Sequence, residues 1–273
     1  MVGLIEGVLG VVLVLVMLWA LHRLSVIGKA TLTLWRTPVD TGVQFEDGQQ
    51  IALEGQVVVD EPARVAERLF DPTDRPVGAY IWHAWTPDTG RNIYDFDKGE
   101  LRGGQNTFAS GIEVGQVGIT TDRHQLNINF KWFNDTYDPD TLSELDVGTP
   151  MSYAKIPTFM TRYLSDSIYI SLESTIGECG INRLRDVLNI DNRDVSAEEF
   201  NIEARGITAG QQLFIIGELQ ESSGVYSVRG TDRTPLLISD TGRGGLIKQL
   251  RWRALKYALS LVGAVGLFVL FVL

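Results

Sequence analysis

Two long apolar runs, one at each end of the chain, constrain its fold more than any other feature. Residues 2–21 carry one charge, Glu6, and the run from Ala254 to Leu273 carries one, Lys256. A helix needs about 20 apolar residues to cross the hydrocarbon core of a bilayer. The sequence therefore predicts a transmembrane helix over 2–21 and a second helix over 246–273 that continues into a span.

Two other interpretations of these runs stay open. A secretory signal peptide has basic residues before its apolar run and small residues after it, whereas Glu6 precedes this run and bulky residues such as Leu21 end it. Buried core helices keep a polar face, and neither run has a polar residue at every third or fourth position. We therefore favour an uncleaved anchor at each end.

Basic residues gather where both runs meet the middle of the chain. Lys29 and Arg36 follow the first run, and Lys248 precedes the second. The positive-inside rule then places the middle domain in the cytoplasm of a cell-membrane protein with two spans. Basic and aromatic residues are also expected at the membrane interface, namely Arg23, Trp35, Arg251, Trp252 and Arg253.

The middle domain is strongly acidic. The chain has 34 Asp and Glu against 24 Lys and Arg, a net charge of -10. Such a surface repels nucleic acid, and it repels anionic lipid everywhere except at the basic residues beside the runs. Lysine is rare and aspartate outnumbers glutamate, a balance that leads us to hypothesise a halophilic source. Unfolding of the solubilised protein below molar salt would support that hypothesis.

Cysteine and histidine are too scarce for the common metal modules. The single cysteine, Cys179, permits no internal disulfide, and we expect it to be a buried apolar side chain. Only His83 and His124 lie inside the domain, and they do not have the spacing of a helical metal site. A site built from both histidines and nearby aspartates is the remaining alternative, and we predict no cofactor.

Residues 45–245 are predicted to form an antiparallel, strand-rich domain, which makes the chain α+β. Apolar and β-branched runs predict strands, and Gly, Pro and Asp predict turns between them. The first strands are expected at 51–59, 79–85, 115–120 and 125–133, with turns at 87–90 and 103–104.

The rest of the domain has one obscure and one clear part. Residues 135–200 are expected to be an insertion or a helical layer, with a strand at 165–172, a helical turn near 184–188 and a helix cap at Ser196. Residues 212–219 and 225–229 should pair as a hairpin. Ser239 or Asp240 should then cap the last helix.

The clear part resembles a known family. Glu203, Arg205, Ile207 and Gly210, then Gly217-Glu218 within LFIIGEL, followed by a hairpin and a membrane helix, resemble the GIDE or "beside a membrane" domain of mitochondrial membrane-bound E3 ubiquitin ligases. The plan of helix, strand-rich domain and helix is similar too. The resemblance implies a GIDE-like domain over most of residues 51–268.

The chain also departs from that family. In the ligases, activity resides in a zinc-binding RING after the second span, and no such Cys/His module is present here. The family's domain faces the intermembrane space, whereas the basic residues of this chain favour the cytoplasm. The resemblance therefore implies the family's binding domain without its catalytic module.

Three classes of function follow. The first is a non-catalytic, membrane-anchored binding or scaffold module with an unknown protein partner. A homo-oligomer of this module is a possible assembly. The second is an enzyme. It is either the membrane subunit of an E3-ligase-like system that transfers a small modifier protein, or a hydrolase that uses Asp95, Asp97 and Glu100. These three acids also fit a solvated turn. The third, a transporter or channel, is disfavoured because two spans line a pore only as an oligomer and no ionisable residue lies at mid-bilayer.

Overall fold

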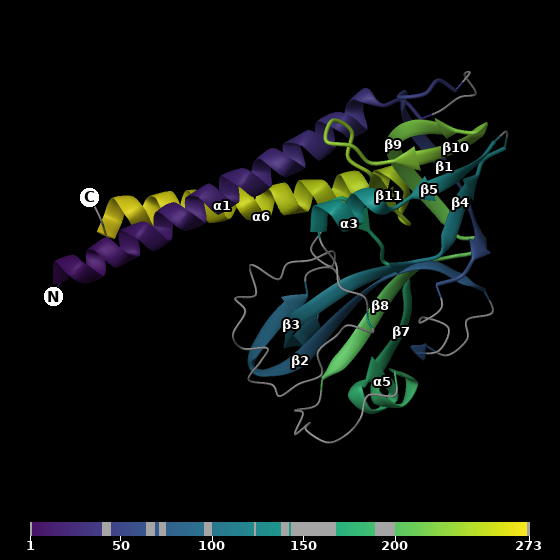
Figure 1. Ribbon diagram of the computed structural model, residues 1–273. Helices are drawn as coiled ribbons and strands as arrows, with labels where there is room; N and C mark the ends of the chain where they lie inside the picture. The colour runs from purple at the N-terminus through teal and green to yellow at the C-terminus, as the bar shows by residue number, and fades with distance from the viewer. Residues whose placement is uncertain are drawn as a thin grey trace.

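In the computed structural model, two β-sheets form a domain at one end of a pair of long terminal helices (Figure 1). The described residues are 2–39, 45–63, 69–70, 75–95, 100–122, 124–137, 142, 168–188 and 200–271. Within them the chain has four helices and eleven strands. The α+β, strand-rich class predicted from the sequence is therefore correct, and apolar helices flank the sheets.

Five strands of the first sheet close into a barrel. They are β1 (Gln50–Glu61), β4 (Gln116–Thr120), β5 (Gln125–Asn129), β9 (Gln212–Ser222) and β10 (Val225–Arg229). Their order is β1-β4-β5-β10-β9, and β1 pairs again with β9 to complete the circle. All neighbours are antiparallel except β5 and β10, which are parallel. This is a small Greek-key barrel of the type that includes the OB-fold.

Strand β1 closes the barrel because it has two partners along its length. Residues Gln50–Gln56 pair with β9, and Gln56–Glu61 pair with β4. Gly55 lies at the change of partner, where an added Cβ would lie 2.3 Å from the Thr120 carbonyl oxygen. A side chain at this position would therefore separate the two strands.

The predicted hairpin of β9 and β10 is confirmed. Its two loop residues, Ser223 and Gly224, both have positive φ, at 54° and 79°. A two-residue loop of this kind matches the right-handed twist of the paired strands. Two short strands, β11 (Leu237–Ser239) and β6 (Ile170–Ser171), extend the sheet beyond β9.

The second sheet has four antiparallel strands and lies beside the barrel. Its order is β3 (Glu100–Val114), β2 (Val77–Asp95), β8 (Asn201–Thr208) and β7 (Thr175–Gly180), followed along the chain from β7 by helix α5 (Ile181–Leu188). Figure 1 shows this sheet on one side of the helix pair, away from the barrel's β9 and β10. Helix α5 confirms the helical turn expected near 184–188.

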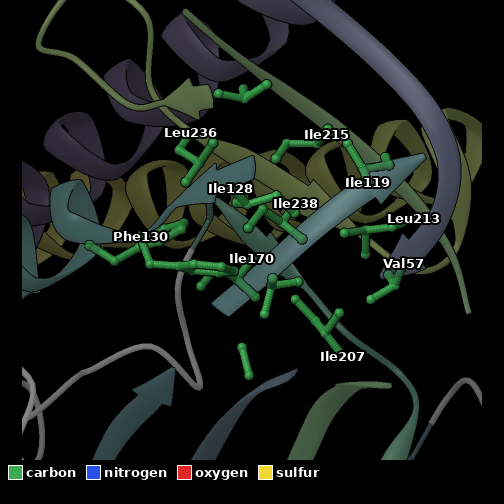
Figure 2. Packing of buried hydrophobic residues seen from close by; sticks show 14 of the residues in the cluster. Val57, Ile119, Ile128, Phe130, Ile170, Ile207, Leu213, Ile215, Leu236 and Ile238 are labelled. Atoms are coloured by element: carbon green, nitrogen blue, oxygen red, sulfur yellow. The ribbon is translucent and has the colours of Figure 1, made fainter. Parts of the chain in front are cut away.

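A continuous apolar core joins the barrel to the second sheet. Barrel residues such as Val57, Ile119, Leu213 and Ile215 point into a shared interior, and Ile207 of β8 approaches it from the second sheet (Figure 2). The opposite face of the second sheet packs its own cluster around Tyr80, Trp82, Cys179, Leu184 and Phe200. Cys179 is thus the buried apolar side chain expected, and burial raises its pKa to about 11.

The first helix, α1, runs from Val2 to Arg36 and is much longer than the predicted span of 2–21. Beyond Leu21 its sequence is amphipathic, and Ile27, Ala30 and Leu34 lie on one face and are buried. These residues pack on the barrel, which continues the helix past the apolar run.

The last helix, α6, runs from Gly242 to Phe271 and lies antiparallel to α1. Trp19 of α1 contacts Tyr257 of α6 edge to face, with 5.1 Å between ring centroids. Fifteen residues after Trp19, the Leu34 carbonyl of α1 accepts a hydrogen bond from Arg243 Nη2 of α6 at 2.9 Å. The two helices therefore stay in register along their length, and their free ends lie together (Figure 1).

The outer halves of both helices are apolar and exposed. Each helix is long and apolar enough to cross a membrane, and only 22% and 11% of the two apolar windows are buried. Val11, Leu15, Val262 and Leu270 are all at least 60% exposed. Within the described residues no other part of the chain covers this surface, so the outer halves of the two helices are not core helices of this domain.

Several predicted boundaries are wrong for physical reasons. The strand expected at 125–133 ends at Asn129, whose Oδ1 accepts the Lys131 amide at 3.0 Å and starts helix α3 (Lys131–Tyr137). The turns expected at 87–90 and 103–104 lie inside β2 and β3, where the register shifts between Asp88 and Asn92.

The obscure segment 135–200 contributes to both sheets. Its described part supplies β6 to the first sheet and β7 to the second, so it is more than a separate layer. Of the strand expected at 165–172, only Ile170–Ser171 is a strand, and 165–167 lie outside the described residues. The cap expected at Ser196 also lies outside them.

The cap expected for the last helix is wrong. Ser239 belongs to β11, and the Asp240 carboxylate accepts the Glu173 and Ser174 amides at 2.8–3.0 Å. Asp240 therefore ties the segment between β6 and β7 to the start of α6, and the helix begins at Gly242 instead of 246.

Substitution of Gly217 by Ala tests the close approach of β9 and β10. An added Cβ would lie 2.6 Å from the Arg229 carbonyl oxygen, which is backbone and cannot rotate away. We expect G217A to destabilise the domain by about 2–4 kcal/mol, measured by urea unfolding of the detergent-solubilised chain. The control is G28A, because nothing lies within 4 Å of a Cβ at helical Gly28; equal loss in both variants would contradict the packing argument.

Candidate functional site

A belt of aromatic and basic residues surrounds the helix pair where its apolar half ends. We call Trp19, Arg23, Arg251, Trp252 and Tyr257 the interface belt. Arg23 places its Cζ 6.0 Å from the Tyr257 ring centroid, and Trp19 contacts the same ring. Aromatic rings and cations of this kind are enriched at the headgroup level of membranes.

A shallow groove lies on the face of α6 that is turned away from α1. It has a volume of ≈ 280 Å³ and is lined by Gly244, Ile247, Lys248, Arg251, Trp252 and Leu255. Leu246, Leu250 and Tyr257 occupy the other side of the helix, against α1. Trp252 is 59% exposed, so the groove presents two cations and an indole outward.

The five residues expected at the interface do not all lie at one depth. Arg251, Trp252 and Arg253 lie just before the apolar part of α6, and Arg23 lies just after that of α1. Trp35 is 66% exposed but follows Leu21 by fourteen residues, about 21 Å along the helix. Trp35 thus lies beside the barrel, beyond the depth of the other four.

Glu203, the first residue of the family-like motif, lies in a partly buried ionic cluster on the second sheet. His83 on β2 approaches it at 3.5 Å between Nε2 and Oε2, and Arg205 approaches it at 3.2 Å between Nε and Oε1. The hydrogen bond from His83 and the charges of His83 and Arg205 outweigh burial and lower the Glu203 pKa to about 2. Arg205 also donates to the Leu172 carbonyl.

Ser110 extends this cluster into a row across three strands. It is the register partner of His83, which is the register partner of Glu203. The order Ser, His and acid is that of a charge-relay hydrolase. However, Ser110 is 1% exposed, so a substrate carbonyl cannot reach its hydroxyl. Ser110, His83 and Glu203 therefore contribute to the packing between the sheets.

A second buried acid, Glu113, lies on the opposite face of the same sheet. It is the register partner of Tyr80, and its Oε1 accepts the Leu142 amide at 3.2 Å. Burial raises the pKa of Glu113 and of the Tyr80 hydroxyl. Two acids with pKa values shifted in opposite directions can act as an acid and base pair, but a sheet separates these two.

The remaining motif residues lie elsewhere in the fold. Ile207 fills the core, and Gly210, with φ of 77°, makes the turn into β9. Glu218 accepts Arg229 Nη2 at 3.1 Å and the Thr231 hydroxyl at 3.2 Å on the barrel. The motif therefore specifies turns, core and ion pairs of the fold, and its members do not converge on one site.

One wall of the barrel is covered by no sheet or helix of the described residues. Its outward residues on β5 and β10 are polar except for Val225, and Asn127 pairs across to Gly118 on one side and Ser227 on the other. Gln125 and Asn127 are exposed. We call Gln125, Asn127, Ser227 and their strand neighbours the polar wall. Sequence reasoning did not identify it, although the alternation in 125–129 already showed that one face of β5 is polar.

The metal and carboxylate alternatives gain no support from the described residues. Among these, no three His, Cys, Asp or Glu side chains come close enough to hold a metal ion. His83 belongs to the Glu203 cluster, whereas His124 stacks on Phe45 at 4.3 Å between ring centroids. Asp97 lies outside the described residues, as do the side chains of Asp95 and Glu100.

Comparison with protein-family models, with curated proteins and with solved structures finds no match to this chain. The functional argument therefore depends on the geometry described above.

Replacement of Glu203 by Gln should cost stability in a pH-dependent way. The folded-state pKa of about 2 lies below the ordinary 4.5, so the carboxylate contributes stability above pH 4.5 that is lost as pH falls toward 2. We expect E203Q to lose about 1–3 kcal/mol at pH 7 and the deficit to shrink below pH 4.5, measured by urea unfolding with tryptophan fluorescence.

Glu178 supplies the matched control for this experiment. It is the register partner of Glu203 on β7 and is exposed. E178Q should change stability by less than about 0.5 kcal/mol at any of these pH values. A deficit in E203Q that stayed constant from pH 7 to 2.5 would show that the charge of Glu203 does not stabilise the fold.

Proposed function

We propose that this chain is a membrane-anchored, non-catalytic binding module that holds a small barrel at a membrane surface for a protein partner. In this proposal α1 and α6 span a cell membrane, and the domain lies in the cytoplasm. The GIDE-like family assignment is part of the proposal and depends on the sequence motif from Glu203 to Glu218 alone.

The attachment of the helices to the barrel supports this proposal most strongly. Phe214 and Ile216 of β9 point outward from the barrel and are fully buried against the helix pair, together with Leu34, Leu237 and Leu246. Arg243 adds a hydrogen bond from α6 to the end of α1. A barrel mounted this way cannot rotate freely above the bilayer, so it presents a fixed face.

The face that remains available for a partner is the polar wall. Its central strand, β5, does not pair with β9, which contacts the helices, so attachment to the helices leaves it open. The corresponding face of OB-type barrels is a common binding surface, although this is an analogy of fold. Its amide and hydroxyl groups can hydrogen-bond to a polypeptide without requiring a charged ligand.

Site-specific photo-crosslinking tests the partner. A photoreactive amino acid at Asn127 of the full chain should give a discrete protein adduct in native membranes. The same probe placed at Gln125 should give this adduct too, and the substitution N127R should then abolish it. Both positions are exposed on β5. The adduct is identified by mass spectrometry.

The control places the same probe at Asn182, an exposed residue of the same type on α5. Equal adducts from Asn127 and Asn182 would contradict a partner specific to the polar wall. Transfer of a small modifier protein that requires this chain would contradict the non-catalytic assignment and favour the ligase-subunit alternative.

Orientation can be measured with one engineered cysteine. The native Cys179 is buried and its pKa is raised, so it should react slowly with maleimides. Val225 is 54% exposed at the hairpin of β9 and β10. We expect V225C to resist a membrane-impermeant maleimide in intact cells and to react after the membrane is opened. Reaction in intact cells would place the domain outside.

A further inference from the structure

We propose that the groove on α6 binds the phosphate headgroup of an anionic phospholipid from the membrane leaflet that faces the domain. This inference relies on the proposed insertion of α1 and α6 in a bilayer. It adds a specific lipid site to the binding module, and it concerns a face of the molecule distinct from the polar wall.

The depth of the groove fits a headgroup. The apolar parts of α1 (2–21) and α6 (255–271) lie side by side, because Trp19 contacts Tyr257, so a hydrocarbon core of about 30 Å would end near Leu21 and Leu255. Trp252 and Arg251 precede Leu255 by three and four residues, about 4.5 and 6 Å along the helix. Each headgroup layer is about 5–8 Å thick.

The groove combines two cations with an apolar floor. Lys248, Arg251, Trp252 and Leu255 follow one another at helical spacings on a single face of α6. A phosphodiester can accept hydrogen bonds from both cations, while its glycerol and upper acyl carbons contact the indole and Leu255. A zwitterionic headgroup would bring its own cation toward Lys248 and gain less.

No acidic side chain of the described residues pairs with the cations of the groove. Among the described residues no ion pair involves Lys248 or Arg251, although the chain carries ten more acidic than basic residues. In contrast, Arg205 and Arg229 each pair with a glutamate. Two unpaired cations on one face of an acidic protein therefore point to an external anion.

Native mass spectrometry of the full chain in detergent tests this site. Phosphatidylglycerol and phosphatidylcholine with the same acyl chains are added at equal concentration. We expect one phosphatidylglycerol to be retained about thirtyfold better than phosphatidylcholine, as two cations near a membrane surface would give. The double variant K248Q/R251Q should lose this preference.

The matched control is the double variant R253Q/K256Q. It removes the same charge closer to the bilayer but on other faces of α6, since neither residue lines the groove. It should keep the preference. Equal loss in both double variants, no preference in the native chain, or full competition by millimolar inorganic phosphate would each overturn the lipid site.

Carbonate washing of the native membranes separates failure of this site from failure of the proposed anchoring. A chain that is extracted by carbonate is not inserted, and both proposals fall. A chain that resists extraction but retains both lipids equally keeps its anchors and lacks the lipid site.

Discussion

The burial of β9 on both faces is the interaction on which the rest of the structure depends. Leu213, Ile215 and Leu219 point into the barrel, whereas Phe214 and Ile216 point out against the helix pair. One strand thus belongs to the barrel core and to the helix contact at once. Burial of two such outward side chains contributes about 3–6 kcal/mol, so separating the helices from the barrel would expose a segment of β9, Leu213–Ile216, that is apolar on both faces.

Charge is distributed so that it reinforces this arrangement. Partly buried acids have partners within the domain. Glu203 pairs with His83 and Arg205, and Asp240 joins the start of α6 to the link between the sheets. The excess negative charge remains on the domain surface, and unpaired cations lie on α6 beside its apolar half. An anionic membrane would repel the acidic domain and attract the cations of the interface belt, which favours one distance between the domain and the membrane surface.

Local patterns were sufficient to predict much of the fold, and pairings between distant segments were not. The alternation in 125–129 and the Ser-Ser-Gly loop gave β5 and the hairpin of β9 and β10 correctly, because period and turn chemistry are local. Closure of the barrel by β1 depends on two partners far along the chain, and no local signal encodes it. Lys131–Phe133 continued the strand pattern, yet Asn129 starts a helix there by accepting the Lys131 amide.

The candidate sites show the same division. Aromatic and basic residues beside an apolar run predicted Arg23, Arg251 and Trp252 of the interface belt, but Tyr257 was not among the predicted interface residues. Trp35 was predicted there, yet it lies about 21 Å along α1 from Leu21. The family-like motif drew attention to Glu203, Arg205 and Glu218, which prove to stabilise the two sheets separately. Substitution of those residues should therefore alter stability before it alters binding. A relative could share every motif residue and bind a different partner, because the polar wall and the α6 groove are built from residues outside the motif.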